Sequence, residues 1–359
     1  MKQLTVQSSH HKYKVSVGPQ LRQQAGELLE REYSKILIIT DTSVAPLYLR
    51  DVRASFTKSE VFTGTVPAGE ASKNLAEYEQ LITKCLEYGL DRQSLIIALG
   101  GGVVGDLAGF VAATFMRGID YVQLPTTILA HDSSVGGKVA VNHPQGKNMI
   151  GSFHSPKAVI YDVETLRTLP EHEIRSGYAE VIKHGCLSSP QLFYDILTKD
   201  LKGMMDPDIL TGHLIKGISI KAEIVELDEK ENGVRKHLNF GHTLGHAIEA
   251  ELGYGKVTHG EAVAVGMLFA MYVSERKLEA DLPYKELTEW LVNNGYPVHT
   301  LPKVSVTGLM KKMKQDKKAI NGNVHMVLLR ELGSPIVLEL EEEDIQSMLS
   351  SFISEVMNR

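Results

Sequence analysis

Hydrophobic and polar positions follow a different pattern in each half of the chain. In the first half, short apolar runs predict buried strands at 35–40, 94–100, 120–125 and 157–162. Helical spacing of the apolar residues predicts helices at 73–90 and 106–116. Strands that alternate with helices are typical of a mostly parallel sheet covered on both faces. The first 17 residues alternate apolar and polar side chains, which predicts a hairpin at a sheet edge.

From about Glu171 the pattern changes to long helices, which the spacing predicts at 176–187, 213–231, 243–252 and 260–278. Residues 325–340 predict a short hairpin that turns at Gly333, and Pro335 favours an edge position. Pro170 precedes a new helix in the segment "RTLPEHE". We therefore expect an α/β domain at 1–168 and a mostly α-helical domain at 169–359.

Composition and charge narrow the class of protein. A chain of 359 residues is long enough for two domains, and its formal net charge of −6 gives no support to nucleic-acid binding. The two cysteines, Cys85 and Cys186, lack the spacing of a metal or redox motif, which favours buried thiols in a reducing compartment. Because the sequence has neither a signal core nor a long apolar run, we expect a cytoplasmic enzyme without a membrane segment.

A glycine cluster follows the predicted strand at 94–100. Gly100, Gly102 and Gly105 match G-x-G-x-x-G, in which backbone N–H groups and a helix N-terminus can approach a pyrophosphate. A glycine-rich packing turn explains the motif equally well. Asp41, which ends an earlier strand, could accept a ribose hydroxyl, so the pattern indicates a variant nucleotide fold.

The segment "DSSVGGKVAVNHPQGKNMIG" at 132–151 predicts a glycine-rich loop. It carries Lys138, Lys147 and Asn148, which suit a phosphate or a carboxylate. Solvated loop lysines are the alternative interpretation.

The segment "LNFGHTLGHAIE" at 238–249 predicts a metal or ligand site. Asn239, His242 and His246 are three and four residues apart, which places them on one face of a predicted helix. His242 and His246 could chelate a divalent metal, although no glutamate follows the first histidine as in H-E-x-x-H.

Two neighbouring helices carry further candidates. Glu180, Lys183 and His184 share one face in "GYAEVIKHG", and His259 precedes an apolar helix. Each such group costs free energy to bury unless it is paired, so several together indicate a shared charged ligand. Spacing alone favours His242 and His246 with Glu180 as the metal ligands.

The whole constellation resembles the 3-dehydroquinate synthase family of sugar-phosphate cyclases. The resemblance runs from about Val66 to Leu329, with the motifs in the expected order: "LGGGVVGDLAGFVAATFMRGI", "LPTT", "DSSVGGK", "GKNMIGSFH", "GYAEVIKHG", "LNFGHTLGHAIE", "HGEAVAVGM" and "DKK". It implies an α/β nucleotide-binding domain with a mostly parallel sheet, followed by a mostly α-helical metal-binding domain.

The resemblance implies two cofactors, NAD and one divalent metal, zinc or cobalt. The implied metal ligands are Glu180, His242 and His259, and His246 becomes a substrate-binding group. The implied NAD-binding positions are Asp41, Glu70, Lys73, Gly101, Gly102, Val103, Gly105, Asp106, Thr126, Thr127, Lys138, Lys147, Thr165, Leu166 and Thr168.

It also implies a substrate pocket and a homodimer, because Arg117 matches an arginine that reaches the partner subunit's pocket. The other pocket positions are Asp132, Lys138, Asn148, Lys183, Lys221, Arg235, Asn239, His246 and one of Lys317 and Lys318. One departure from the family pattern is a one-residue deletion at His131, which affects the register of Asp132.

The activity implied by the resemblance converts 3-deoxy-D-arabino-heptulosonate 7-phosphate to 3-dehydroquinate and phosphate. The steps are transient oxidation by NAD⁺, phosphate elimination, re-reduction, ring opening and aldol closure. Alternatives are another sugar-phosphate cyclase such as 2-deoxy-scyllo-inosose synthase, a metal-dependent NAD alcohol dehydrogenase, or a non-catalytic scaffold. Lys221 and Arg235 favour a substrate that carries a carboxylate.

Overall fold

The computed structural model describes all residues except 204–205, 232, 254, 300–303, 316–323 and 358–359. The chain forms two compact units, residues 1–169 with 205–229, and residues 170–204 with 230–359. This division differs from the expected one by a single residue, Leu169, at the boundary and by the segment 205–229. The helix α7 (Pro207–Leu227) packs on β1, β2 and α4, and so belongs with the first unit and not with the helical one.

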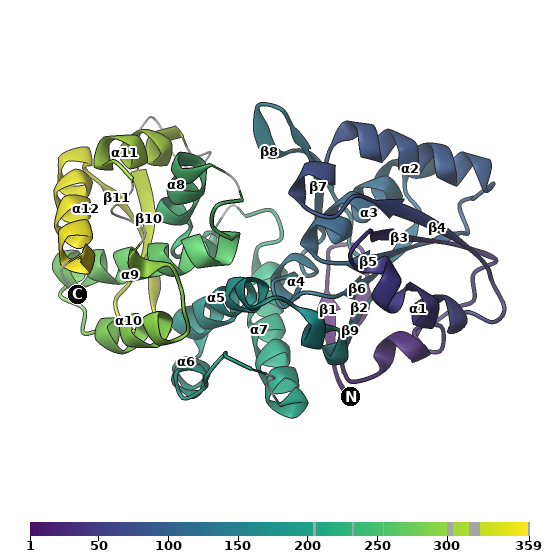
Figure 1. The fold of residues 1–359 in the computed structure, drawn as a ribbon, viewed down its shortest axis with the longest axis horizontal. Coiled ribbons are helices and arrows are strands. Elements are labelled where there is room, and N and C mark those ends of the chain that lie inside the picture. Colours follow the sequence, from purple (N-terminus) through teal and green to yellow (C-terminus); the bar gives the residue numbers. More distant parts are fainter. Residues whose placement is uncertain (204–205, 232, 254, 300–303, 316–323, 358–359) are drawn as a thin grey trace. The chain divides into compact units, whose positions relative to one another are not determined.

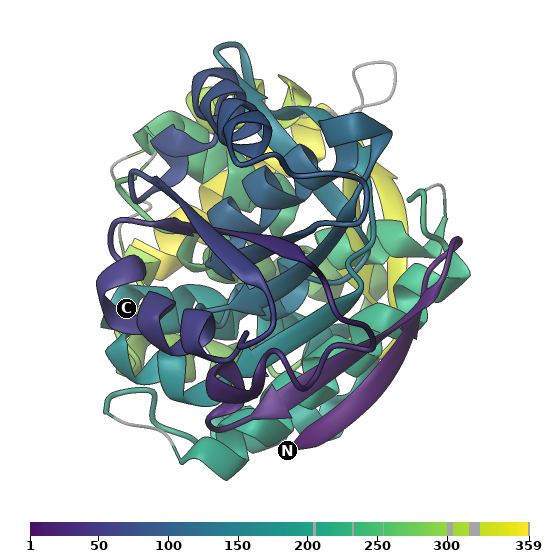
Figure 2. The same cartoon turned by 90° about the vertical axis from the view of Figure 1, so that its right-hand side faces the viewer.

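A seven-stranded sheet forms the centre of the described part of the first unit (Figure 1). Its strands lie in the order β1-β2-β9-β6-β5-β3-β4, and all neighbouring pairs except β1 with β2 are parallel. The strands are β1 (Lys2–Gln7), β2 (Lys12–Gly18), β3 (Lys35–Asp41), β4 (Glu60–Val66), β5 (Leu95–Gly100), β6 (Asp120–Pro125) and β9 (Ala158–Asp162). The predicted parallel sheet and the edge hairpin, drawn in purple in Figure 2, are confirmed.

Alternate residues of the central strands fill two cores, one on each face of the sheet. Leu37 and Ile39 of β3 pack with α2 (Leu75–Glu87) and α3 (Gly102–Thr114). Ile36 and Ile38 pack on the other face with side chains of η1 (Leu21–Gln24), η2 (Ala45–Leu49) and α1 (Arg50–Ala54). Burial on both faces explains why these strands are continuous apolar runs in the sequence.

The prediction of a loop at 132–151 is wrong. After α4 (Ala130–Ser133), the chain forms an antiparallel hairpin of β7 (Lys138–His143) and β8 (Gly146–Phe153). Val139 and Val141 are buried in the core that also contains α3. They alternate with Lys138, Ala140 and Asn142, a weak strand signal that the glycines and lysines around it obscured.

The second unit is helical in its described part, apart from one hairpin of β10 (Val324–Leu329) and β11 (Pro335–Leu340). Its helices are α5 (Glu171–Ser188), α6 (Pro190–Leu197), α8 (His242–Leu252), α9 (His259–Leu278), α10 (Tyr284–Asn293), α11 (Val306–Gln315) and α12 (Glu342–Met357). Helix α9 is buried from Gly260 to Ser274 and contacts α5, α8, α10 and α12. Even so, no described helix combines the length and apolar character that crossing a membrane requires.

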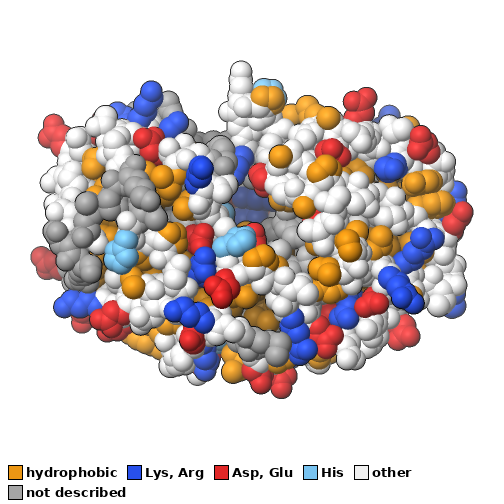
Figure 3. All heavy atoms as spheres, viewed as in Figure 1, with side chains coloured by type: hydrophobic (Ala, Val, Ile, Leu, Met, Phe, Trp, Pro, Cys, Tyr) orange, Lys and Arg blue, Asp and Glu red, His pale blue; other side chains and the backbone are white. Residues whose placement is uncertain are grey.

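The charged surface agrees with the weak net charge of the sequence. On the face drawn in Figure 3, acidic and basic side chains of the described residues are interspersed over both units. Among the described residues on this face, no basic stripe of the kind typical of nucleic-acid-binding proteins is visible.

Candidate functional site

The segment that carries the helical histidines bends before its helix begins. Asn239 ends the 3₁₀-helical segment η6 (Val234–Asn239), and α8 starts only at His242. Gly241 lies between them with φ of 81°, a conformation that glycine adopts without strain. The prediction that Asn239 shares a helix face with His242 is therefore wrong. Its Nδ2 instead donates to Glu231 Oε1 at 3.0 Å.

Three histidines meet because α8 and α9 approach each other closely. A Cβ built on Gly266 of α9 would lie 1.9 Å from the carbonyl oxygen of Gly241, so only glycine allows this approach. The ring centroids of His242 and His246 lie 5.2 and 5.7 Å from that of His259. One nitrogen from each of the three rings lies within 4.8 Å of the others.

The start of α9 holds His259 in place. Thr258 caps the helix in a reciprocal capping box with Glu261. The other carboxylate oxygen of Glu261 accepts from Arg175 Nε at 2.8 Å. Gly260 packs on Ser176, where a Cβ would lie 1.9 Å from the backbone oxygen. His259 therefore projects from a backbone that cannot easily shift.

His242 and His259 both direct Nε2 towards the carboxylate of Glu180. Nδ1 of His242 is 3.2 Å from the carbonyl oxygen of Phe240, and Nδ1 of His259 is 2.9 Å from Glu249 Oε2. Their Nε2 atoms lie 3.5 and 3.6 Å from Glu180 Oε1. Hydrogen bonds at Nδ1 select the tautomer with Nε2 available as a metal ligand.

Carboxylates make this cluster favourable for a cation. Burial by itself lowers the pKa of His259, but the hydrogen bonds and charges of Glu180 and Glu249 outweigh it and raise that pKa to about 9. Glu180, 1% exposed on α5, also forms an ion pair with Lys183. Two imidazoles and a carboxylate form a donor set suited to zinc or cobalt, so these residues fit the metal.

The geometry agrees with two ligand sets that share His242 and His259. The third ligand is Glu180 in one set and His246 in the other. Residue spacing within one helix could not show that His259 and Glu180 meet His242, because these two residues come from other helices.

Glu249 is a member of the cluster that the sequence reasoning missed. It lies three residues after His246 and seven after His242 in α8, and both intervals return to the same side of a helix. That spacing could have identified it.

The glycine turn of the first unit has a packing role of its own. Gly101 precedes α3, which begins at Gly102, and Thr126 N–H donates to the carbonyl oxygen of Gly100 at 3.0 Å. A Cβ on Gly101 would lie 2.9 Å from Thr127 Cγ2, and one on Gly105 would lie 2.9 Å from Gln123 Oε1. Packing thus favours glycine at both positions, and the helix N-terminus beside them fits a pyrophosphate.

A polar cluster lies beside this turn. Lys73 Nζ donates to Asp106 Oδ2 of α3 and to Asn148 Oδ1 of β8, both at 2.5 Å. Asn142, which the sequence reasoning missed, donates to Glu70 Oε1 at 2.6 Å and accepts from Asn148 N at 2.9 Å. These hydrogen bonds connect four predicted residues that come from three separate segments of the sequence: Glu70, Lys73, Asp106 and Asn148.

A second pair of predicted residues meets between α4 and α7. Lys221 Nζ contacts the carbonyl oxygen of Asp132 and lies 2.9 Å from its Oδ2. Lys221 is 6% exposed, so this buried ammonium has a negative partner. With the one-residue deletion at His131, the Asp132 carboxylate thus still contacts Lys221, another predicted pocket residue.

Other predicted residues lie elsewhere. Lys138 begins β7 and Lys147 lies in β8, whereas Arg235 is buried in η6. Arg117 is exposed, with φ of 69°, beyond the C-terminal end of α3. That helix has 13 residues, so Arg117 is separated from the glycine turn by about 20 Å. Lys317 and Lys318 lie outside the described residues.

Comparison with known proteins gives the same family from both parts of the chain. Residues 63–176 match the family model described as 3-dehydroquinate synthase N-terminal, and residues 177–319 match the corresponding C-terminal model. The chain is 52% identical over 354 residues to the 3-dehydroquinate synthase of Oceanobacillus iheyensis, and the match covers 98% of each chain.

Two solved structures share the fold. One is 2-deoxy-scyllo-inosose synthase complexed with carbaglucose-6-phosphate, NAD⁺ and Co²⁺, with a TM-score of 0.86, 25% identity and coverage of 98% of this chain and 99% of that one. The other is the 2-epi-5-epi-valiolone synthase ValA from Streptomyces hygroscopicus with NAD⁺ and Zn²⁺ bound, at a TM-score of 0.87 and 23% identity, covering 97% and 99%.

The predicted fold class is thereby confirmed, since both structures match the chain over nearly its whole length. Two consecutive family models and a relative with half of its residues identical leave one conclusion: the chain belongs to the 3-dehydroquinate synthase family.

Proposed function

We propose that the chain is a 3-dehydroquinate synthase that converts 3-deoxy-D-arabino-heptulosonate 7-phosphate to 3-dehydroquinate and phosphate. Relatives of that activity match it at about half of all positions. The observation in the structure that carries the proposal is the convergence of His242 Nε2 and His259 Nε2 on Glu180 Oε1. A buried carboxylate shared by two imidazoles is typical of a functional site, which favours an enzyme over a non-catalytic scaffold.

Glu180, His242 and His259 are proposed to hold the divalent metal, as in the His₂Glu sites of known catalytic zinc centres. The glycine turn before α3 and the Lys73 cluster are proposed to hold NAD. When bound, the metal supplies a Lewis acid and NAD⁺ supplies a reversible hydride acceptor. The protein's own part is to bind the substrate, orient it and control its protons.

The charged residues of the predicted pocket suit the two anionic groups of the substrate. Lys221 Nζ lies 2.9 Å from Asp132 Oδ2, which holds it in place, and it is proposed to pair with the substrate carboxylate together with the guanidinium of Arg235. Lys138, Asn148, Asn239 and His246 are proposed to bind the phosphate. Such contacts stabilise the phosphate as it leaves, and its own oxygen is proposed to remove the neighbouring proton.

Arg117 is proposed to act in the partner subunit's pocket. Its exposure and its distance from the glycine turn, at the other end of α3, support an intermolecular role. A homodimer and a cytoplasmic location stay predictions.

Cofactor turnover tests the proposed activity. With the heptulosonate phosphate, Zn²⁺ and NAD⁺ far below the substrate concentration, the protein should release many equivalents of phosphate while absorbance of NADH stays near zero. Stoichiometric NADH would indicate the alcohol dehydrogenase alternative. Equal turnover of a sugar phosphate that lacks the carboxylate would indicate another sugar-phosphate cyclase.

Glu249→Gln should weaken metal binding. The glutamine keeps the shape of the side chain but loses the charge that holds Nδ1–H of His259, so we expect metal affinity to fall roughly 10- to 100-fold. Competition with a chelator measures it.

Glu251→Gln, two residues further along α8, is the matched control and should bind metal like the unmodified protein. Equal affinities in the two variants would remove Glu249 from the metal site.

A further inference from the structure

Two segments far apart in the sequence carry residues proposed to bind NAD at the carboxyl edge of the sheet. β3 ends at Asp41 and continues into η2 and α1, whereas β9 continues into η5 (Val163–Thr168), which carries Thr165 and Thr168. β5 and β6 lie between β3 and β9 in the sheet, so the two strand ends are separated by about 14 Å. The glycine turn of the proposed cofactor site follows β5, within this interval.

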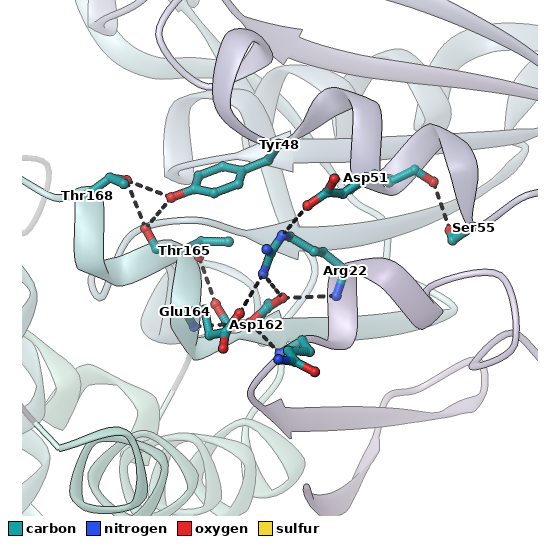
Figure 4. Close-up of polar contacts among 10 residues, drawn as sticks. Arg22, Tyr48, Asp51, Ser55, Asp162, Glu164, Thr165 and Thr168 are labelled. Carbon is teal, nitrogen blue, oxygen red and sulfur yellow. Dashed lines mark hydrogen bonds and ion pairs between the residues drawn. The ribbon is translucent and has the colours of Figure 1, made fainter.

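Tyr48 of η2 joins the two segments (Figure 4). Its hydroxyl donates to the carbonyl oxygen of Thr165 at 3.1 Å and lies 2.7 Å from Thr168 Oγ1. Thr168 Oγ1 also donates to the carbonyl oxygen of Thr165 at 3.1 Å. Because Tyr48 and Thr165 are buried, the loss of the Tyr48 hydroxyl would leave the carbonyl oxygen of Thr165 with one hydrogen-bond donor fewer, away from water.

Arg22 joins the same segments a second time (Figure 4). Its Nη1 donates to Asp162 Oδ2 at 2.8 Å and to Glu164 Oε2 at 3.1 Å, both at the start of η5. Its Nε donates to Asp51 Oδ2 at 3.0 Å in α1, which follows η2 directly. The guanidinium also lies 5.5 Å from the ring centroid of Tyr48. Two independent links thus fix η5 against the segment after β3.

We propose that Tyr48 is a positioning residue for NAD, and that Arg22 supports it. The Tyr48 hydroxyl sets the orientation of Thr165 and Thr168 relative to the segment that follows Asp41, so that both sides of the nucleotide site are formed before the cofactor arrives. A site formed in advance binds more tightly, because the ligand does not have to order it. This inference rests on the proposed function, since it assumes that the chain binds NAD.

The test compares two tyrosine variants by calorimetric titration of the metal-loaded protein with NAD⁺. Tyr48→Phe removes only the hydroxyl and should raise the Kd for NAD⁺ about tenfold, the effect of losing one well-placed buried hydrogen bond. Arg22→Lys should shift the Kd in the same direction. Metal content should stay unchanged in both variants, because the proposed metal ligands lie in the other compact unit.

Tyr33→Phe is the matched control. Its hydroxyl donates to Asp120 Oδ2 at 2.9 Å, at the amino end of β6 and thus at the opposite edge of the sheet. This variant should lose thermal stability to a similar degree and bind NAD⁺ with the unmodified Kd. If the Kd for NAD⁺ is unchanged in Tyr48→Phe, or rises equally in Tyr33→Phe, Tyr48 is not a positioning residue for NAD, while the proposed function still stands. Failure of the unmodified protein to bind NAD⁺ would overturn the proposed function as well.

Discussion

Replacing Glu180 by glutamine should leave the purified protein without its divalent metal, whereas replacing His246 by alanine should leave the metal in place. The proposed ligands are Glu180, His242 and His259, and a catalytic site with three protein ligands already keeps an open position. Loss of one ligand should weaken metal binding at least about 100-fold, more than the loss of a supporting hydrogen bond does. Glu180→Gln should therefore be inactive unless metal is added.

Four variants measured together by elemental analysis identify the ligand set. His242→Ala and His259→Ala should be metal-free whichever third ligand is correct, so they establish the size of the effect. His246→Ala should keep a full equivalent of metal and show its defect in substrate binding or in phosphate elimination. The reverse pattern, with metal retained in Glu180→Gln and lost in His246→Ala, would establish the three-histidine set. A metal-free His246→Ala beside a metal-loaded His259→Ala would favour His242 and His246 with Glu180.

Gly266→Ala should destabilise the helical unit strongly and abolish metal binding with it. The added methyl group would lie 1.9 Å from the carbonyl oxygen of Gly241 and 3.0 Å from the amide nitrogen of Gly245. Because these neighbours are backbone atoms, α8 must move away from α9. Overpacking of this kind costs about 3 kcal/mol, and more where the backbone resists. Chemical denaturation and metal content measure the two effects.

Gly212→Ala provides the control, because Gly212 also lies inside a helix but a Cβ there meets no atom within 4 Å. This change should be neutral or stabilise α7 by roughly 0.5–1 kcal/mol, since alanine is the better helix former. If Gly266→Ala unfolds at the same denaturant concentration as the unmodified protein, the close approach of α8 and α9 does not assemble the histidine cluster.

Periodicity along the chain identified the elements that are buried on a regular pattern. The strands at 35–41 and 95–100 were predictable because both faces are covered, and the hairpin at 324–340 because a turn interrupts two apolar runs. The same reasoning failed at 132–151, where Val139 and Val141 alternate over too few residues to outweigh the glycines around them. It also failed at Asn239, because Gly241 breaks the helical path that the spacing assumes.

The sequence by itself determined the fold class, the family motifs and the residue types of the site, since these depend on local patterns and on their order. Only the tertiary structure decided which groups meet. Glu180, His242 and His259 come from three helices, and their convergence depends on glycine contacts between α8 and α9. Tyr48 and Thr165 are 117 residues apart. No local pattern records such a pair, because the free energy that holds it comes from packing of the whole unit and not from the residues beside it.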